Sequence, residues 1–296
     1  MRAWWCVLFL LSGCLRPVRT VERLDDTSSV AVGAHAIQGS LSAAVEVRSE
    51  DPSVVSVEWI SRDPSLARIA GSFYFDREHD HRPDDLFVDV RAHREGVTRL
   101  LFLDADGALI GRATVGATQP QKVDLGGEGL PFVLVGHRHW LPVCVSAGIH
   151  HLAARGIGVS AEGALTDAIE GTERWGGVWF EAHTPGIGTI TTTVGGVKGT
   201  RTVRVIRPSD IDAIHLDPHS WGVSYRLLHH GTAVHGPACT WQTNGEGVEL
   251  FDVFRTDVSG PPMGSVRVRP IMSGTLRITC HVGPAQATTE GEFRPW

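Results

Sequence analysis

The 296-residue sequence lacks the motifs on which most enzyme classes depend. It contains no Gly-x-Ser-x-Gly turn, no His-Glu-x-x-His helix, no phosphate-binding glycine loop and no Cys-x-x-Cys pair. A catalytic site would have to be assembled from scattered residues such as Glu162, Asp167 and His183, and any chain of this length contains such sets. The sequence therefore predicts a non-enzymatic protein without a cofactor, and an envelope enzyme is only a residual alternative.

Lysine is also scarce, because Lys122 and Lys198 are the only lysines among 27 basic residues. The formal net charge is −6, and no basic stretch alternates with aromatic residues as a nucleic-acid surface requires. Hydrophobic residues make up 42% of the chain and charged residues 20%, which is typical of a folded globular protein. Nucleic acid is therefore not expected as a partner.

One apolar run, residues 3–11, lies at the start of the chain after the basic Arg2. Its nine residues are too few to cross a membrane, since a spanning helix needs roughly 20. A positive residue, a short apolar run and then small residues are typical of an export signal that is removed. The sequence therefore predicts that the protein leaves the cytoplasm.

The segment Leu11-Ser12-Gly13-Cys14 resembles the lipobox of bacterial lipoproteins. The resemblance implies that residues 1–13 are the signal peptide, that Cys14 carries the lipid, and that residues 14–26 form a tether. In Gram-negative lipoproteins an Asp after the lipidated cysteine often marks retention in the inner membrane. Since Leu15 stands there, the resemblance implies the outer membrane or cell surface, provided that the host is Gram-negative.

Three further cysteines, Cys144, Cys239 and Cys280, remain beyond Cys6 and Cys14. An oxidising compartment allows one pair among them. Cys239 and Cys280 fall in one predicted domain and both have strand-like neighbours, so we favour a disulfide between them. Cys144 is then predicted to be a buried free thiol.

Short runs of alternating or β-branched residues dominate the chain, and helical periodicity is almost absent. Turn-forming residues separate the runs, and three places are typical of hairpins: Asp104–Gly107, Gly195-Gly196 and Asn244-Gly245. Many short strands joined by such turns favour an all-β fold built from sandwiches.

A repeat divides the chain into three. Residues 87–101, 178–192 and 266–279 each show a strand, a short link, and then glycine and threonine that lead into another strand. The repeats are about 90 residues apart, close to the size of an immunoglobulin-type sandwich. We expect three tandem Ig-like β-sandwich domains, at 27–118, 119–206 and 207–296, in each of which the link carries the chain from one sheet to the other.

Two stretches resemble the bacterial Ig-like (Big) families. Residues 59–69 (WISRDPSLARI) are similar to the families' Trp-Ser-Ser-Asp-Pro-Ser-Val-Ala-Thr-Val stretch, and residues 231–241 are similar to their Gly-x-x-Val-x-Gly hairpin before a core tryptophan. The middle repeat matches only through residues 185–192. Trp59 and Trp241 stand where a sandwich core takes a large ring, so both are expected in the core.

Fifteen histidines suggest a search for metal ligands. His79 and His81 lie in the acidic segment 76–85 and could supply two ligands, although a solvated acidic loop explains them equally. His150-His151 and His229-His230 are adjacent pairs, and adjacent residues of an extended strand point to opposite faces. We therefore expect those pairs to be surface residues.

These observations together predict a non-enzymatic, lipid-anchored protein of the envelope or cell surface, whose Ig-like modules act as spacers or as binding and adhesion units. The expected partners are the membrane, through Cys14, and an unidentified envelope protein or glycan. The alternative is a periplasmic or surface metal-binding lipoprotein that uses the His79/His81 loop.

Overall fold

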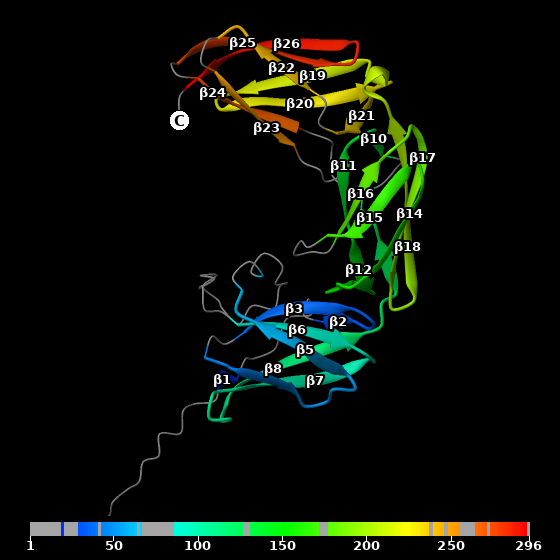
Figure 1. Cartoon of the computed structure of the whole chain (residues 1–296), viewed down its shortest axis with the longest axis vertical. Coiled ribbons are helices and arrows are strands. Elements are labelled where there is room, and N and C mark those ends of the chain that lie inside the picture. Colours follow the sequence, from blue (N-terminus) through cyan, green and yellow to red (C-terminus); the bar gives the residue numbers. More distant parts are fainter. Residues whose placement is uncertain are drawn as a thin grey trace, which may run out of the picture.

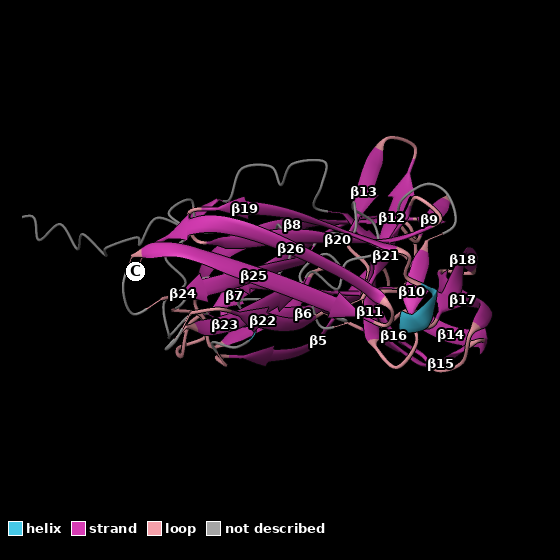
Figure 2. Cartoon of the chain, turned by 90° about the horizontal axis from the view of Figure 1, so that it is seen from above, coloured by secondary structure: helices cyan, strands magenta, loops and turns pink. Residues whose placement is uncertain are grey.

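The computed structural model describes residues 19–20, 29–40, 43–63, 66, 86–126, 131–171, 177–236, 239–245, 248–254, 264–270 and 273–294. These residues form strands almost throughout, and their one labelled helix is the short 3₁₀ turn η3 (Pro208–Asp210) (Figure 2). In the described part of the chain no helix is long and apolar enough to span a membrane. The described part of the protein is all-β, as predicted.

The first sandwich is built from two sheets with a shared core. One contains β1, β2, β4, β7 and β8, and the other contains β3, β5 and β6. Leu100 and Phe102 of one sheet meet Val88 and Val90 of the other in the core. The strands are β1 (Arg19–Thr20), β2 (Ser29–Ala31), β3 (His35–Ser40), β4 (Glu46–Ser49), β5 (Val55–Ser61), β6 (Leu86–Ala92), β7 (Gly96–Leu103) and β8 (Leu109–Thr118).

The second sandwich pairs β11, β16 and β15 in one sheet and β14, β17 and β18 in the other. Phe180 and Leu141 of the first sheet pack with Ile190 and Val203 of the second. A small additional sheet holds β9, β12 and β13. The strands are β9 (Lys122–Asp124), β10 (Phe132–Leu134), β11 (Arg138–Pro142), β12 (Cys144–Ala147), β13 (His150–Leu152), β14 (Gly158–Gly163), β15 (Leu165–Glu170), β16 (Gly177–Ala182), β17 (Gly186–Val194) and β18 (Val197–Ile206).

The third sandwich places β22, β25 and β26 against a sheet in which β20 pairs with β19, β21 and β24, and β24 with β23. Trp241 is half-buried and packs against this core, with its ring edge-on to Tyr225 at 5.2 Å, so the predicted core position is confirmed only in part. The strands are β19 (Ala213–His219), β20 (Gly222–His229), β21 (Thr232–His235), β22 (Thr240–Thr243), β23 (Glu249–Phe254), β24 (Gly264–Arg269), β25 (Gly274–Val282) and β26 (Ala285–Phe293).

The threefold repeat corresponds to one recurring unit of topology. In each sandwich a strand (β6, β16 or β24) lies in one sheet and the next strand (β7, β17 or β25) lies in the other. The second strand then forms a hairpin with its successor, β8, β18 or β26. The predicted passage of the chain between sheets at the glycine-containing link is therefore confirmed.

Two of the three predicted hairpin turns are confirmed. Asp104–Gly107 joins β7 to β8, and Gly195-Gly196, both with positive φ, joins β17 to β18. Asn244-Gly245 is different, because it connects β22 to β23 and these strands lie in different sheets. The hairpin prediction there is wrong, and the Asn244 side chain instead accepts a hydrogen bond from the backbone N–H of Arg277 at 2.8 Å.

The prediction that Trp59 lies in the core is also wrong. Its side chain is 38% exposed on β5. The pairing of β5 with β6 shifts register between Val57 and Trp59, a β-bulge that places one additional residue in the strand. Because side chains alternate between faces, such a shift turns the following residues to the opposite face.

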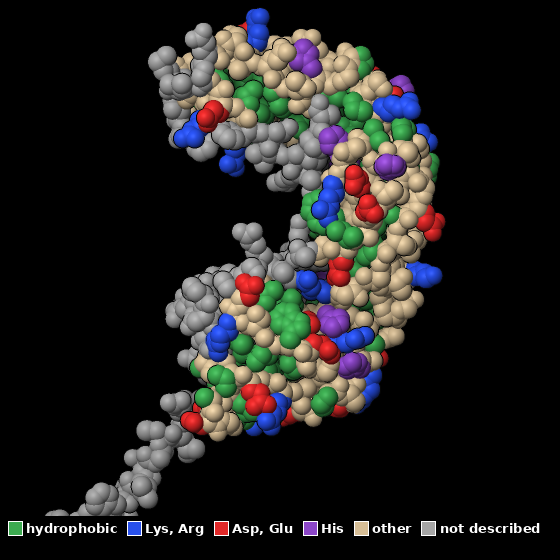
Figure 3. All heavy atoms as spheres, in the orientation of Figure 1, with side chains coloured by type: hydrophobic (Ala, Val, Ile, Leu, Met, Phe, Trp, Pro, Cys, Tyr) green, Lys and Arg blue, Asp and Glu red, His purple; other side chains and the backbone are tan. Residues whose placement is uncertain are grey.

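The three sandwiches follow one another along an arc (Figure 1). The first lies nearest the beginning of the chain, and the third forms the far end of the arc. Charged side chains of both signs are scattered over the visible face without forming one large patch of either sign (Figure 3).

Candidate functional site

Several residues singled out from the sequence lie outside the described part of the chain. Cys14, His79 and His81 are among them. Glu162, Asp167 and His183 are all described, and no hydrogen bond or ion pair joins these three. The structure therefore does not bring the scattered candidate residues together into a catalytic set.

Cys239 and Cys280 form a disulfide in the third sandwich, the pairing favoured from the sequence. Cys280 lies on β25 and is fully buried, and Cys239 immediately precedes β22. The two strands are direct neighbours, with Trp241 opposite Cys280 in the register. The disulfide therefore joins adjacent strands of one sheet beside the core ring of Trp241.

Cys144 is a free thiol, but it is half-buried rather than buried as predicted. It lies on β12 in the small additional sheet, where one face remains open to solvent. Its Sγ lies 2.9 Å from Nδ1 of His151 on the neighbouring strand β13. Partial burial and the nearby Asp124 carboxylate raise the pKa of this thiol, so Cys144 favours its protonated, unreactive form.

The junction between the first and second sandwiches is made by main-chain hydrogen bonds. The backbone N–H of Ala31 donates to the carbonyl oxygen of Ala153 at 2.9 Å, and the N–H of Ala153 donates to the carbonyl oxygen of Ser29, also at 2.9 Å. His35 and Arg155 exchange two bonds of 2.8 Å. Ala31 also belongs to the core of the second sandwich. The segment after β13 thus pairs across the junction with β2 and with the start of β3 of the first sandwich.

Charged side chains lie within the same junction. His35 Nδ1 is 3.2 Å from Asp89 Oδ2, and both oxygens of Glu170 accept from the N–H of Gly156 at 2.9 and 3.0 Å. Burial raises the pKa of Asp89 and of Glu170, although the positive charge of Arg155 acts in the opposite direction on both. Burial also lowers the pKa of Arg155 itself. These shifts indicate that the contact excludes water from charges on both sides.

The junction between the second and third sandwiches depends on β10. This three-residue strand pairs in parallel with β18 of the second sandwich and, on its other edge, with β21 of the third. Successive residues of a strand point to opposite faces. Val133 accordingly lies in the core of the second sandwich, and Leu134 lies in that of the third. One continuous nine-stranded sheet therefore runs through both sandwiches.

Both junctions contain a glycine at a point of close approach. A Cβ on Gly195, whose φ is +54°, would lie 2.5 Å from the carbonyl oxygen of Val32 in the first sandwich. A Cβ on Gly236 would lie 2.8 Å from Cβ of Leu134 in β10. Neither position has room for a larger residue, which is further evidence that the sandwiches are in direct contact.

A buried histidine supports β10 from the second sandwich. His139 on β11 is fully buried, stacks on Phe180 at 5.5 Å and donates from Nε2 to the carbonyl oxygen of Leu134 at 3.1 Å. Its other ring nitrogen, Nδ1, is buried without a hydrogen-bond partner. Burial lowers the pKa of His139 to about 4, so the ring is neutral at pH 7.

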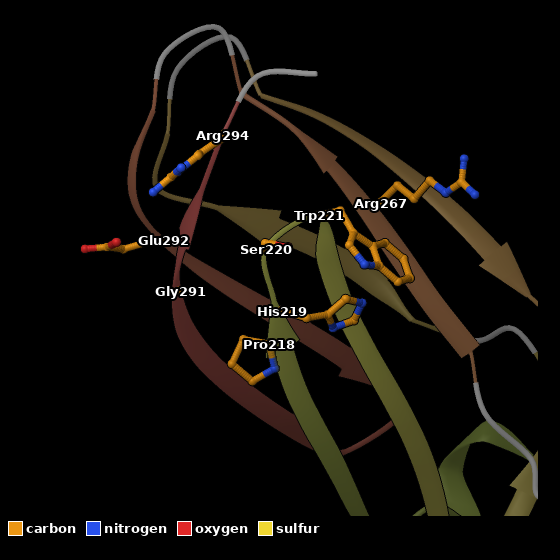
Figure 4. A pocket seen from close by; sticks show the side chains of 8 residues that line it. All are labelled: Pro218, His219, Ser220, Trp221, Arg267, Gly291, Glu292 and Arg294. Carbon is orange, nitrogen blue, oxygen red and sulfur yellow. The ribbon is translucent and has the colours of Figure 1, made fainter.

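The free tip of the third sandwich carries an open pocket of about 820 Å³ (Figure 4). The turn between β19 and β20 supplies its aromatic wall, where Trp221 is 47% exposed and meets the ring of His219 edge-on at 4.0 Å. Val268 N donates to the carbonyl oxygen of Trp221 at 3.1 Å and fixes the turn to β24. The pocket is lined by Pro218, His219, Ser220, Trp221, Arg267, Gly291, Glu292 and Arg294.

The pocket combines an aromatic face with charged groups of both signs. Arg267 comes from β24, whereas Glu292 lies at the end of β26 and Arg294 directly follows that strand (Figure 4). Exposed indole rings beside hydrogen-bonding groups suit sugar rings and peptide side chains. This site was not predicted from the sequence, although Trp221 stands next to Gly222 in a turn between two strand-like runs, a position that favours an exposed ring.

No protein-family model matches the chain, and no curated protein sequence matches it. Domains 4–9 of the surface layer protein SbsC align over 90% of this chain at 13% identity, with a TM-score of 0.33. This chain covers only 40% of that fragment.

Two other solved structures align at similar levels. A three-Ig fragment of titin aligns over 90% of this chain and 95% of its own length, at 8% identity and a TM-score of 0.23. The D0-D1 domain of intimin aligns over 59% of this chain and 98% of its own, at 12% identity and a TM-score of 0.23.

Proposed function

We propose that this protein is a non-enzymatic, lipid-anchored spacer of the bacterial envelope or cell surface, a stiff arm of three Ig-like modules that holds its tip away from the membrane. The observation that carries the proposal is that main-chain hydrogen bonds cross both junctions between sandwiches. Flexible linkers between domains would leave those groups to solvent. Because both junctions are held by hydrogen bonds, the three sandwiches can keep the first and the last of them apart.

The proposed direction of the arm follows from the sequence. The lipobox-like segment that ends at Cys14 precedes the first sandwich, so a lipid there would tether the arm at its beginning. The pocket around Trp221 lies in the last sandwich, on the turn between β19 and β20. The proposal places binding or adhesion at this tip, where a glycan or envelope protein can reach it.

A proline at Ala153 is expected to loosen the first junction. The change Ala153→Pro removes the N–H that donates to Ser29 O, and proline cannot replace that donor. Small-angle X-ray scattering of the wild type should fit one arc-shaped conformation. The variant should give a broader distance distribution that a single conformation does not fit.

The matched control is Ala105→Pro in the exposed turn between β7 and β8, where proline is tolerated. Its scattering should equal that of the wild type. If Ala153→Pro also scatters like the wild type, the hydrogen bonds do not fix the junction and the stiff-arm proposal fails.

Labelling with radioactive palmitate tests the anchor. In cells that export the full chain, the wild type is expected to incorporate label, and Cys14→Ser should reduce incorporation to background because serine lacks the thiol that takes the diacylglycerol. Cys144→Ser is the control for a second cysteine and should label normally. Label that survives Cys14→Ser would refute lipidation at this residue.

A further inference from the structure

Two adjacent histidines, His229 and His230, meet an aspartate where the second sandwich joins the third. His229 ends β20, and His230 begins the turn to β21 with a φ of +49°. This left-handed backbone breaks the alternation of an extended strand, so both rings lie on the same side, with centroids 4.2 Å apart. The expectation that such a pair points to opposite faces therefore does not apply here.

Asp212 lies in the segment that links η3 to β19 and faces this turn. Its Oδ2 accepts from the backbone N–H of His230 at 2.6 Å and lies 3.1 Å from Nδ1 of the same residue. One ligand atom from each of Asp212, His229 and His230 can be chosen so that all three lie within 4.8 Å of one another. Small side-chain rotations would bring them to the spacing of ligands around one ion.

The hydrogen bonds around this group leave a suitable lone pair free. Nδ1 of His229 lies 2.6 Å from the carbonyl oxygen of Asp210, and because a carbonyl only accepts, Nδ1 must carry the proton. Nε2 of neutral His229 is then unprotonated and available. A backbone carbonyl that holds the second nitrogen of a histidine in this way is the usual outer-shell arrangement of metal-binding histidines.

We propose that Asp212, His229 and His230 bind one divalent ion of the zinc class. Two imidazoles and one carboxylate match the ligands that zinc takes, and water would complete a four-coordinate site. Calcium and magnesium prefer six or more oxygen ligands, which this group does not supply. A bound ion would link the segment after β18 to the β20–β21 turn, close to β10, whose Phe132 ring contacts His229 at 5.4 Å.

Zinc titration by calorimetry tests the site in the full chain, purified in detergent without a polyhistidine tag. The wild type should bind zinc, and His229→Ala/His230→Ala should lower the affinity at least tenfold. Cobalt substitution gives a second readout, since the visible absorption of a four- or five-coordinate cobalt complex should disappear in the same variant.

Two milder variants serve as controls for misfolding of the double variant. Asp212→Asn preserves size, and His230→Ala truncates a side chain that is 82% exposed, so neither opens a cavity. Each should lower the affinity for zinc at least tenfold while thermal unfolding of the zinc-free protein is unchanged.

The matched control is His150→Ala/His151→Ala, an adjacent exposed pair in β13, and a second control is His79→Ala/His81→Ala in the acidic segment. Both variants should retain the high-affinity zinc. Absence of binding to the wild type, or binding unchanged in His229→Ala/His230→Ala, would overturn the proposal, as would loss of that zinc in either control.

Discussion

Acidification from pH 7 to pH 4 is expected to reduce the stability of the second sandwich by about 3 kcal/mol through His139 alone. The folded-state pKa of this ring is lowered from 6.5 to about 4 by burial, so its stabilising effect is complete above pH 6.5 and is lost as the pH falls through the folded-state pKa. The cause is visible in the structure, because protonation would place a charge on the unpartnered Nδ1. After correction for intrinsic rates, amide hydrogens of β11 should exchange about a hundredfold faster at pH 4.

His139→Gln separates this effect from general acid denaturation. Glutamine retains an N–H that can donate to Leu134 O but does not titrate, so the variant should be less stable at pH 7 and show a smaller pH dependence of exchange at β11. His150→Gln, at an exposed position in β13, should preserve the dependence of the wild type. An unchanged dependence in His139→Gln would show that other groups control acid unfolding.

Loss of the Cys239–Cys280 disulfide is expected to destabilise the third sandwich by about 4 kcal/mol. The two residues are 41 positions apart, and the entropy of closing a loop of that length in the unfolded chain gives this magnitude. In Cys239→Ala/Cys280→Ala, amide hydrogens of β25 should exchange about a thousandfold faster than in the oxidised wild type.

Reduction and substitution should give the same result. Wild type treated with a phosphine reductant is expected to match Cys239→Ala/Cys280→Ala, whereas Cys144→Ala, which removes the free thiol, should not change exchange in β25. Equal exchange in oxidised and reduced wild type would contradict the prediction and mean that β22 and β25 are held by packing around Trp241 alone.

The fold was predictable where the signal was local and repeated. The three glycine-containing links and the turns at Asp104–Gly107 and Gly195-Gly196 required only residue types that favour strands or positive φ. Trp59 was not predictable, because a β-bulge changes the phase of a strand without any marker in the two-residue alternation. The predicted burial of Cys144 was wrong because this residue lies in a small three-stranded sheet, one face of which remains open to solvent.

The candidate sites were harder to predict from the sequence than the fold. No local feature of Phe132–Leu134 indicates that this strand pairs with two partners about 70 and 100 residues further along the chain, because such pairing depends on tertiary contacts. The His229-His230 pair could have been found, since Gly231 directly follows it and a glycine after two polar residues favours a turn. In an extended strand the two rings would point to opposite faces, whereas the turn brings them together.

The position of β10 has a consequence for how this protein can be divided. The chain passes from the second repeat to the third near residue 206, but the hydrogen bonds of the sheet have no break there. Cutting the chain at that point would remove β10 from β21 and leave an unpaired strand edge, and such edges promote aggregation. It would also remove Leu134 from the core of the third sandwich. The second and third sandwiches therefore form one inseparable unit, which recombination between repeats could exchange only as a pair.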